Sequence, residues 1–223
     1  MKISKETIEI LKNFSQINPN LAMSGGNKIA TITVHKHIAA EAIVEEDFPA
    51  FGIYDLPVFL GDVSLFDDPD FNFKDTHVIL ESGKRKSKFH FADEDMLVTP
   101  PKNIKMPKAK ISFILTQEDH AFINKAAATM TLADMSVESD GKKVMLSVFD
   151  KEDSTSNDIS IEVAKGDGQK YKMFFKVDNL RMLPGTYNVS IGVSDNGKGA
   201  LSLFENDAID LKYYIAVEAD SEL

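Results

Sequence analysis

Two lysines near the N-terminus, Lys5 and Lys12, have a spacing that would place both positive charges on one face of a helix. Seven residues are close to two helical turns, so both side chains come round to nearly the same angle. Lysines on one helical face can contact the phosphates of a nucleic acid without reading its sequence. A solvated helix with two ordinary lysines is the alternative that the pattern leaves open.

Metal binding, cofactor binding and catalysis have weaker support in the sequence. His35 and His37 alternate along a predicted strand and share one face, but no third metal ligand lies near them in the sequence. The chain has no cysteine, and it contains no phosphate-binding glycine loop, dinucleotide fingerprint or nucleophile elbow. We therefore expect no metal, no cofactor and no catalytic residue, and we interpret the chain as a non-enzyme.

Composition limits the partners that the chain can have. The 223 residues suit one large domain or two of about 110 residues. A formal net charge of -10 argues against an ordinary basic DNA-binding domain, although it allows a small separate basic patch. No apolar stretch approaches the roughly 20 residues that a membrane span needs, and the N-terminus lacks the apolar core of a signal peptide. We expect a cytoplasmic protein with no membrane partner.

Apolar periodicity predicts the elements that position Lys5 and Lys12. A helix over 4–17 would bury Ile3, Leu11 and Phe14, with both lysines on the opposite side. A tight turn is predicted at 25–27, and a second helix over 55–66 with Asp55 as its cap. The predicted strands of this half are 21–24, 28–34, 38–44, 48–53, 72–74, 77–81 and 86–91.

A proline-rich segment separates the two halves. Residues 98–108 have no periodicity and contain three prolines, which indicates an extended connector. We predict an N-terminal domain over 1–97, the connector over 98–108 and a C-terminal domain over 109–223.

The second half repeats the order of elements. A helix over 116–129 is predicted to bury Phe122, Ile123, Ala126 and Met130, with Lys125 at the edge of the opposite face. A short helix is predicted over 177–182, and the strands 158–164 and 171–175 are expected to pair around 165–168. The remaining predicted strands are 110–115, 132–138, 143–149, 186–194, 200–204 and 211–218. Mostly antiparallel strands with a few covering helices give an α+β fold of two topologically similar domains.

Several segments carry a resemblance to a known family. They are MKISKETIEILKNFSQIN at the N-terminus, Tyr54-Asp55-Leu56 with Phe59-Leu60 and Ser64-Leu65, Pro184-Gly185-Thr186-Tyr187, and the tail Tyr214-Ile215-Ala216-Val217-Glu218-Ala219-Asp220-Ser221. In these residues the chain resembles the sliding clamps of T-even-type bacteriophages, which are DNA polymerase processivity factors. The segments keep their order and are spread over the whole chain.

The resemblance implies a fold and a function. The fold would be two DNA-clamp domains per subunit, with antiparallel sheets on the outside and helices lining the hole of a homotrimeric ring. The ring would encircle double-stranded DNA without sequence preference and tether the replicative DNA polymerase. The resemblance also implies two further partners, an ATP-dependent clamp loader and late transcription factors associated with RNA polymerase. The ring would act in the cytoplasm of an infected bacterial host.

The same resemblance makes some basic residues candidates for DNA contact. The residues expected to face DNA in the hole are Lys5, Lys12, Lys125, Lys176 and Arg181. A loop cluster of Lys84, Arg85 and Lys86 could touch DNA at the rim, and a charged turn that protects a sheet edge is its alternative.

Partners of clamps insert a short hydrophobic peptide beside the connector, and this gives a second candidate site. Its expected residues are Val98, Pro100, Pro101, Ile104 and Met106 of the connector, with Tyr214, Ile215 and Val217 of the last strand. The alternative is that these side chains only fix the connector to the domains. For the whole chain, the competing hypothesis is a monomeric non-enzymatic binding module, or a phage structural protein, with two β-rich domains.

Overall fold

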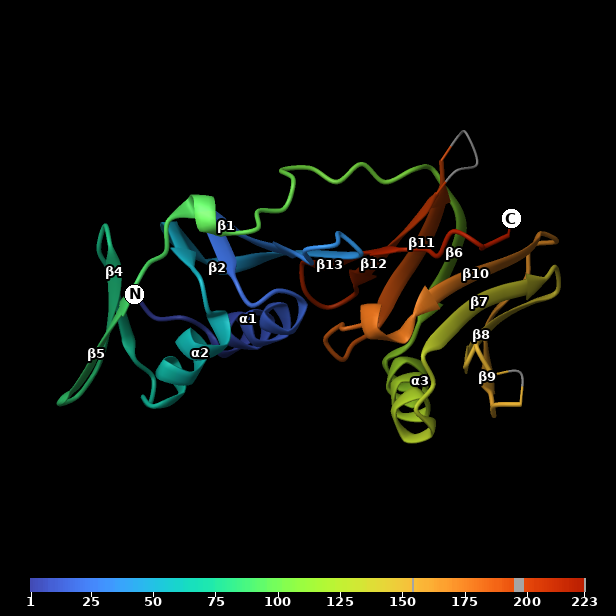
Figure 1. Cartoon of the computed structure of the whole chain (residues 1–223), viewed down its shortest axis with the longest axis horizontal. Coiled ribbons are helices and arrows are strands. Elements are labelled where there is room, and N and C mark those ends of the chain that lie inside the picture. Colours follow the sequence, from blue (N-terminus) through green and yellow to red (C-terminus); the bar gives the residue numbers. More distant parts are fainter. Residues whose placement is uncertain (154, 195–198, 223) are drawn as a thin grey trace. The chain divides into compact units, whose positions relative to one another are not determined.

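The computed structural model describes residues 1–153, 155–194 and 199–222 (Figure 1). The chain divides into two compact units, Met1–Lys102 and Asn103–Leu223. The division falls inside the segment predicted to be the connector. Each unit is described by itself below.

The first element of unit 1 is the helix α1 (Lys5–Ile17). Ser4 begins it as the N-cap, because its hydroxyl accepts a hydrogen bond from the backbone N–H of Thr7 at 3.2 Å. Its buried side includes Leu11 and Phe14, as predicted. Pro19 follows the C-cap and prevents the helix from continuing.

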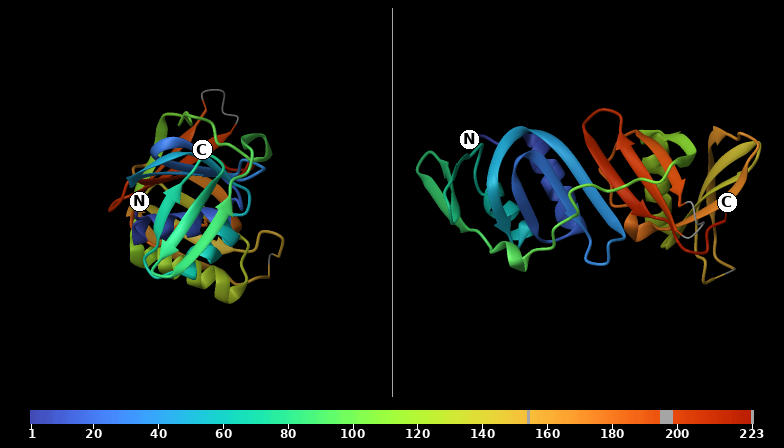
Figure 2. Two further views of the ribbon diagram at one scale, coloured as in Figure 1. Left: turned by 90° about the vertical axis from the view of Figure 1, so that its left-hand side faces the viewer. Right: turned by 90° about the horizontal axis from the view of Figure 1, so that it is seen from above.

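Two long strands, β1 (Leu21–Ile32) and β2 (Ile38–Ile53), form an antiparallel hairpin where four short strands were predicted. The prediction of a turn at 25–27 was wrong. Gly25 and Gly26 have φ of 87° and 93° inside β1, and the register shifts between Gly26 and Lys28, where the extra residues lie on β2, so this segment is an irregularity of the ladder and not a turn. The right-hand view of Figure 2 shows the hairpin arching over α1.

The rest of unit 1 is a second helix and a small sheet. The helix α2 (Leu56–Ser64) begins at its cap Asp55, whose carboxylate accepts from the Val58 N–H at 3.0 Å. It lies on the same side of the β1–β2 hairpin as α1 (Figure 1). The strands β3 (Asp70–Phe73), β4 (His77–Ser82) and β5 (Arg85–His90) form an antiparallel sheet in that order, and a short 3₁₀ turn, η1 (Glu94–Met96), follows.

Unit 2 repeats the arrangement of strands around a covering helix. The helix α3 (Gln117–Met130) follows β6 (Ala109–Leu115). One sheet contains β6, β11 (Tyr187–Val193), β12 (Ala200–Asn206) and β13 (Leu211–Ala216). The other has the order β10-β7-β8-β9 and is built from β7 (Asp134–Asp140), β8 (Lys143–Phe149), β9 (Ile159–Lys165) and β10 (Lys170–Lys176).

The predicted pairing of β9 with β10 was wrong, because these strands lie at opposite edges of their sheet. The loop that joins them crosses over the β7–β8 turn instead. The Gly166 N–H donates to Lys142 O at 2.7 Å, and the Gly168 N–H donates to Gly141 O at 3.0 Å. A Cβ on Gly166 would lie 2.6 Å from the Gly141 backbone, so the crossing requires glycine at this position.

The predicted helix over 177–182 is only a 3₁₀ turn, η2 (Val177–Asn179). Leu180 and Met182, which follow it, are buried in the core of unit 2. Burial of these two side chains, rather than helix formation, accounts for the apolar spacing in this segment.

Candidate functional site

The exposed face of α1 carries both of the lysines that the sequence placed there. Lys5 and Lys12 are exposed, opposite the buried side of the helix. Lys12 forms an ion pair with Glu9 at 2.7 Å, and Glu6 adds a second acidic residue to the exposed surface. The face therefore mixes charges of both signs, and Lys5 is its more available cation.

A buried carboxylate fixes the start of α1. Glu46 of β2 accepts a backbone hydrogen bond from Ser4, and its other oxygen accepts from the Thr7 hydroxyl at 2.6 Å. Burial alone would raise the pKa of Glu46, but the hydrogen bonds from Ser4 and Thr7 lower it below its usual value. The sequence prediction missed Glu46, although its place between the inward-facing Val44 and Phe48 was a usable signal.

The exposed face of α3 differs from the predicted one. His120 and Ala127 are buried, whereas Phe122 is 47% exposed, so the buried side is rotated relative to the prediction. Lys125 consequently lies within the exposed face rather than at its edge, between Phe122 and Ala128. Phe122 beside Lys125 is a surface feature that the sequence prediction assigned to the core.

Lys176 has a structural partner. Its ammonium lies 2.5 Å from the carboxylate of Asp134, whose side chain is 3% exposed. The hydrogen bond to Asp134 raises the pKa of Lys176. Since removal of this lysine would leave the buried carboxylate without a counter-charge among the described residues, holding only the Lys151 backbone N–H at 3.0 Å, the structure gives Lys176 a role in the fold of unit 2.

Arg181 and the predicted rim cluster lie on the surface. The Arg181 Nε donates to the carbonyl oxygen of Asp178 at 2.9 Å. Lys84, Arg85 and Lys86 are exposed at the β4–β5 turn and the start of β5, an edge strand of its sheet, and Lys86 pairs with Glu81 at 2.7 Å. This placement agrees with the edge-protection alternative.

The candidate peptide groove is only partly available. Ile215 and Val217 are buried in the core of unit 2, with exposed fractions of 0% and 8%, so their assignment to a peptide site was wrong. Strand alternation turns Tyr214 to the other face, where it is half-buried.

The connector is fixed at both ends, which supports the alternative reading for this segment. The Val98 N–H donates to Asn20 Oδ1 at 3.1 Å in unit 1. In unit 2, a Cβ on Gly192 would lie 2.4 Å from Pro107 O, so β11 and the end of the connector are in close contact. The other connector residues, Pro100, Pro101, Ile104 and Met106, are exposed or half-buried.

The described surface presents exposed lysines and a pair of neighbouring histidines. His35 and His37 are exposed, with ring centroids 6.0 Å apart. Within the described ranges, no group of three or more His, Cys, Asp or Glu side chains could hold a metal ion, and no helix is long and apolar enough to cross a membrane. Exposed lysines on α1 and α3 are suited to transient contact with a polyanion.

Comparison with known proteins identifies the family. The family described as gp45 sliding clamp, C terminal, matches residues 112–219. The chain is 32% identical to the sliding clamp of Vibrio phage KVP40, over 98% of this chain and all of that one. It is 30% identical to the sliding clamp of Escherichia phage RB69 and 29% identical to that of Enterobacteria phage T4, with 99% of this chain and 98% of each relative covered.

Solved structures agree at the level of the fold. The proliferating cellular nuclear antigen from Entamoeba histolytica superposes with a TM-score of 0.68 at 11% identity, over 95% of this chain and 94% of that one. The A. fulgidus PCNA, solved with the C-terminal region of FEN-1, gives a TM-score of 0.69 at 12% identity, covering 96% of each chain. The fold is therefore that of the clamps, and the full-length identity to the phage proteins shows that the chain belongs to the family of bacteriophage sliding clamps, the processivity factors of DNA replication.

Proposed function

We propose that three copies of this clamp close into a ring around duplex DNA and hold the phage DNA polymerase at the primer end. The observation that carries the proposal is the repeated build of the two units, each with antiparallel sheets and a helix that exposes lysine, Lys5 on α1 and Lys125 on α3. A closed ring does not need tight phosphate contacts, because topology prevents its escape. Effective concentration then keeps the attached polymerase at its substrate.

The setting proposed for the ring follows from this mechanism. An ATP-dependent loader opens the ring, and the chain itself performs no catalytic step. Late transcription factors bound to RNA polymerase would use the ring as a platform, and all of this would take place in the cytoplasm of the infected bacterium.

Two sheet edges support closure by the chain's own copies, because one is basic and the other exposes acidic side chains. β5 is an edge strand with exposed Arg85 and Lys88. β9 is an edge strand with exposed Glu162, which pairs with Lys143 at 2.8 Å within the chain, and exposed Asp158 precedes it. An exposed strand edge is a template for pairing, and opposite charges favour one partner over another. We propose that β5 of one copy pairs with β9 of the next.

Light scattering tests the assembly. Three chains of 24.7 kDa should give a mass of about 74 kDa at micromolar concentration and moderate salt. Lys88→Glu should shift the population toward monomer, and Glu162→Lys in the same chain should restore part of the trimer. Lys36→Glu, in the exposed turn that joins β1 and β2, is the matched control and should have no effect. A mass of one chain under all conditions would contradict the ring.

Retention on DNA tests the mechanism. With the loader and ATP present, the clamp should stay on nicked circular DNA through gel filtration and be lost after a restriction enzyme linearises the circle. A surface-binding protein would be lost from, or retained on, both forms alike. Equal retention on both forms would reject topological binding.

A further inference from the structure

The C-terminal tail, residues 218–222, lies along the edge of β10 in unit 2. Lys172 and Glu222 exchange two backbone hydrogen bonds of 2.8 Å as an antiparallel bridge. The Phe174 N–H donates to Ser221 Oγ at 2.9 Å. The tail thus occupies backbone groups that β10 turns away from β7.

The tail and the edge have opposite charges. Every second residue of the tail is acidic: Glu218, Asp220 and Glu222. Lys151 pairs with Asp220, and its ammonium also lies 4.1 Å from the centroid of the Phe174 ring. Of the lysines on β10 itself, Lys172 pairs with Glu138 at 3.1 Å and Lys176 pairs with Asp134 at 2.5 Å. Lys151 is therefore the lysine that holds the acidic tail through a side-chain ion pair.

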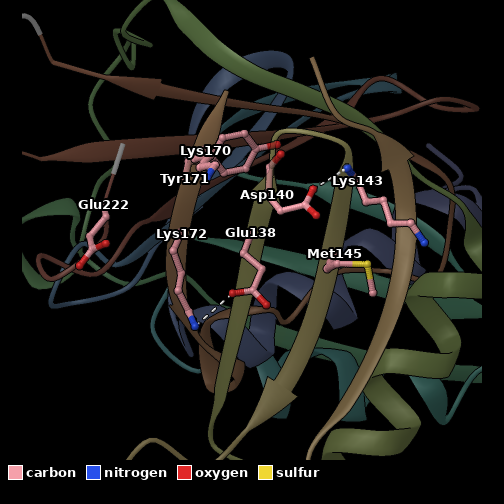
Figure 3. Close-up of a pocket in the computed structure, with 9 residues that line it drawn as sticks. Glu138, Asp140, Lys143, Met145, Lys170, Tyr171, Lys172 and Glu222 are labelled. Atoms are coloured by element: carbon pink, nitrogen blue, oxygen red, sulfur yellow. Dashed lines mark hydrogen bonds and ion pairs between the residues drawn. The ribbon is translucent and has the colours of Figure 1, made fainter. Parts of the chain in front are cut away.

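Open space flanks the tail on two sides. A hollow of about 530 Å³ begins at Glu222 and extends over Lys170, Lys172 and Met145 (Figure 3). A second hollow of about 290 Å³ lies beside Ser221 and includes Lys110 and Met173 in its lining. Ala219, Asp220 and Glu222 are exposed. Residues 218–222 are therefore held by backbone pairing and charge.

We propose that the edge of β10 is a binding site for an extended acidic peptide segment of a partner protein, and that the C-terminal tail is the intramolecular occupant which that segment displaces. Strand addition to an exposed edge supplies the backbone hydrogen bonds, and Lys151 selects an acidic side chain. This inference does not depend on ring closure or on DNA, so it can fail while the proposed function holds.

Peptide binding to a truncated chain tests the site. The probe is a fluorescent peptide with the sequence of residues 217–223, and fluorescence anisotropy is measured with the full chain and with a chain ending at Val217. The attached tail competes at high effective concentration, so the truncated chain should bind the probe at least tenfold more tightly. Equal affinity for the two chains, or no binding to either, would overturn the proposal.

A variant of full length guards against misfolding of the truncated chain. Asp220→Lys should release the tail without shortening the chain, and the probe should again bind more tightly than to the unaltered protein.

Charge exchange between Lys151 and the probe tests the ion pair itself. In the truncated chain, Lys151→Glu should weaken binding of the probe. A probe with lysine at the position of Asp220 should then recover affinity for this variant. Failure of that recovery, with thermal melting unchanged, would remove Lys151 from the site.

Discussion

At the scale of single residues, Glu46 has a role in holding the helix α1 in place. Its carboxylate receives the Ser4 N–H and the Thr7 hydroxyl at the first turn of α1, where the helix dipole also favours negative charge. The start of α1, and with it the place of Lys5, depends on this one side chain of β2.

Replacing this carboxylate should weaken unit 1. Glu46→Gln keeps the shape but loses the charge that two donors share, and we expect a cost of about 1–3 kcal/mol in the free energy of unfolding. Urea denaturation measures it. Glu45→Gln, at the exposed neighbouring position, is the control and should change stability by less than about 0.5 kcal/mol. Equal effects of the two substitutions would remove the anchoring role.

His120 should make unit 2 sensitive to acid. Its Nε2 is buried without a hydrogen-bond partner among the described residues. Burial lowers the pKa of His120 from 6.5, and the hydrogen bond with the Gly185 backbone opposes this only in part. The unfolded chain therefore binds a proton more readily than the folded one, so stability falls as the pH drops below about 6.5.

The test compares thermal melting of the protein and of His120→Leu at about pH 8 and about pH 5.5. The loss of stability on acidification should be smaller in the variant, because the variant has no buried imidazole to protonate. The other histidines, His35, His37, His77 and His90, are at the surface or half-buried and are present in both proteins. An identical pH dependence in both proteins would contradict the role of His120.

At the scale of elements, α1 and α3 differ in how far the sequence determines them. Ser4, Asp55 and Thr116 predict the helix starts correctly, because an N-cap acts through its own neighbours in the sequence. The buried side of α3 was not predictable in the same way. Whether Phe122 or His120 faces the sheet depends on which strand side chains lie beneath the helix, and that is set by tertiary packing.

Charge reversal on α1 should have a larger effect on processive synthesis at Lys5 than at Lys12. Lys5→Glu should lower processive synthesis by about two- to fivefold, the value of one exposed charge contact. Lys12→Glu should lower processive synthesis less, since the ion pair with Glu9 already neutralises Lys12. Primer extension with the loaded clamp measures this, with Lys36→Glu as the control. Unchanged processivity in the Lys5→Glu, Lys12→Glu double variant, with the trimer intact, would show that α1 does not contact DNA.

The loop crossing in unit 2 should tolerate nothing larger than glycine. Gly166→Ala would force a methyl group against the Gly141 backbone, with an expected cost of about 1–3 kcal/mol. Gly61→Ala is the matched substitution. It lies on the exposed side of α2 with no atom within 4 Å, so it should stabilise the chain by about 0.5–1 kcal/mol. Chemical denaturation of both variants checks the opposite signs.

At the scale of the whole molecule, the sequence predicted the order of the elements better than their number or their connections. The 98–108 connector was predicted from proline and the lack of periodicity, which are local signals. The position of β9 and β10 at opposite edges of their sheet was not predicted. Consecutive strands usually pair, and here the β7–β8 hairpin lies between them and prevents that pairing. In the same way, Gly25-Gly26 has the composition of a turn, and only pairing with the partner strand β2 makes it part of a continuous strand.

The candidate site shows the same limit. Exposure of Lys5 and Lys12 follows from helical spacing, which the sequence contains. The pairing of Lys176 with Asp134 joins positions 42 residues apart, and no local pattern reports it. Strand alternation could have placed Ile215 and Val217 in the core, since they alternate with Tyr214 along one strand.

The pairing of β6 with β11 has a consequence for biosynthesis. Tyr187 of β11 lies opposite Leu115 of β6, so this ladder closes only when most of unit 2 has been made. The β1–β2 hairpin and the β3-β4-β5 sheet of unit 1 join strands that are neighbours in the chain. Local pairing is fast and distant pairing is slow, so unit 1 should fold on the ribosome while unit 2 is still incomplete. Each newly made chain should thus pass through a stage in which β5 is already formed but β9 is not, so the proposed pairing of β5 with β9 could not join two nascent chains at that stage.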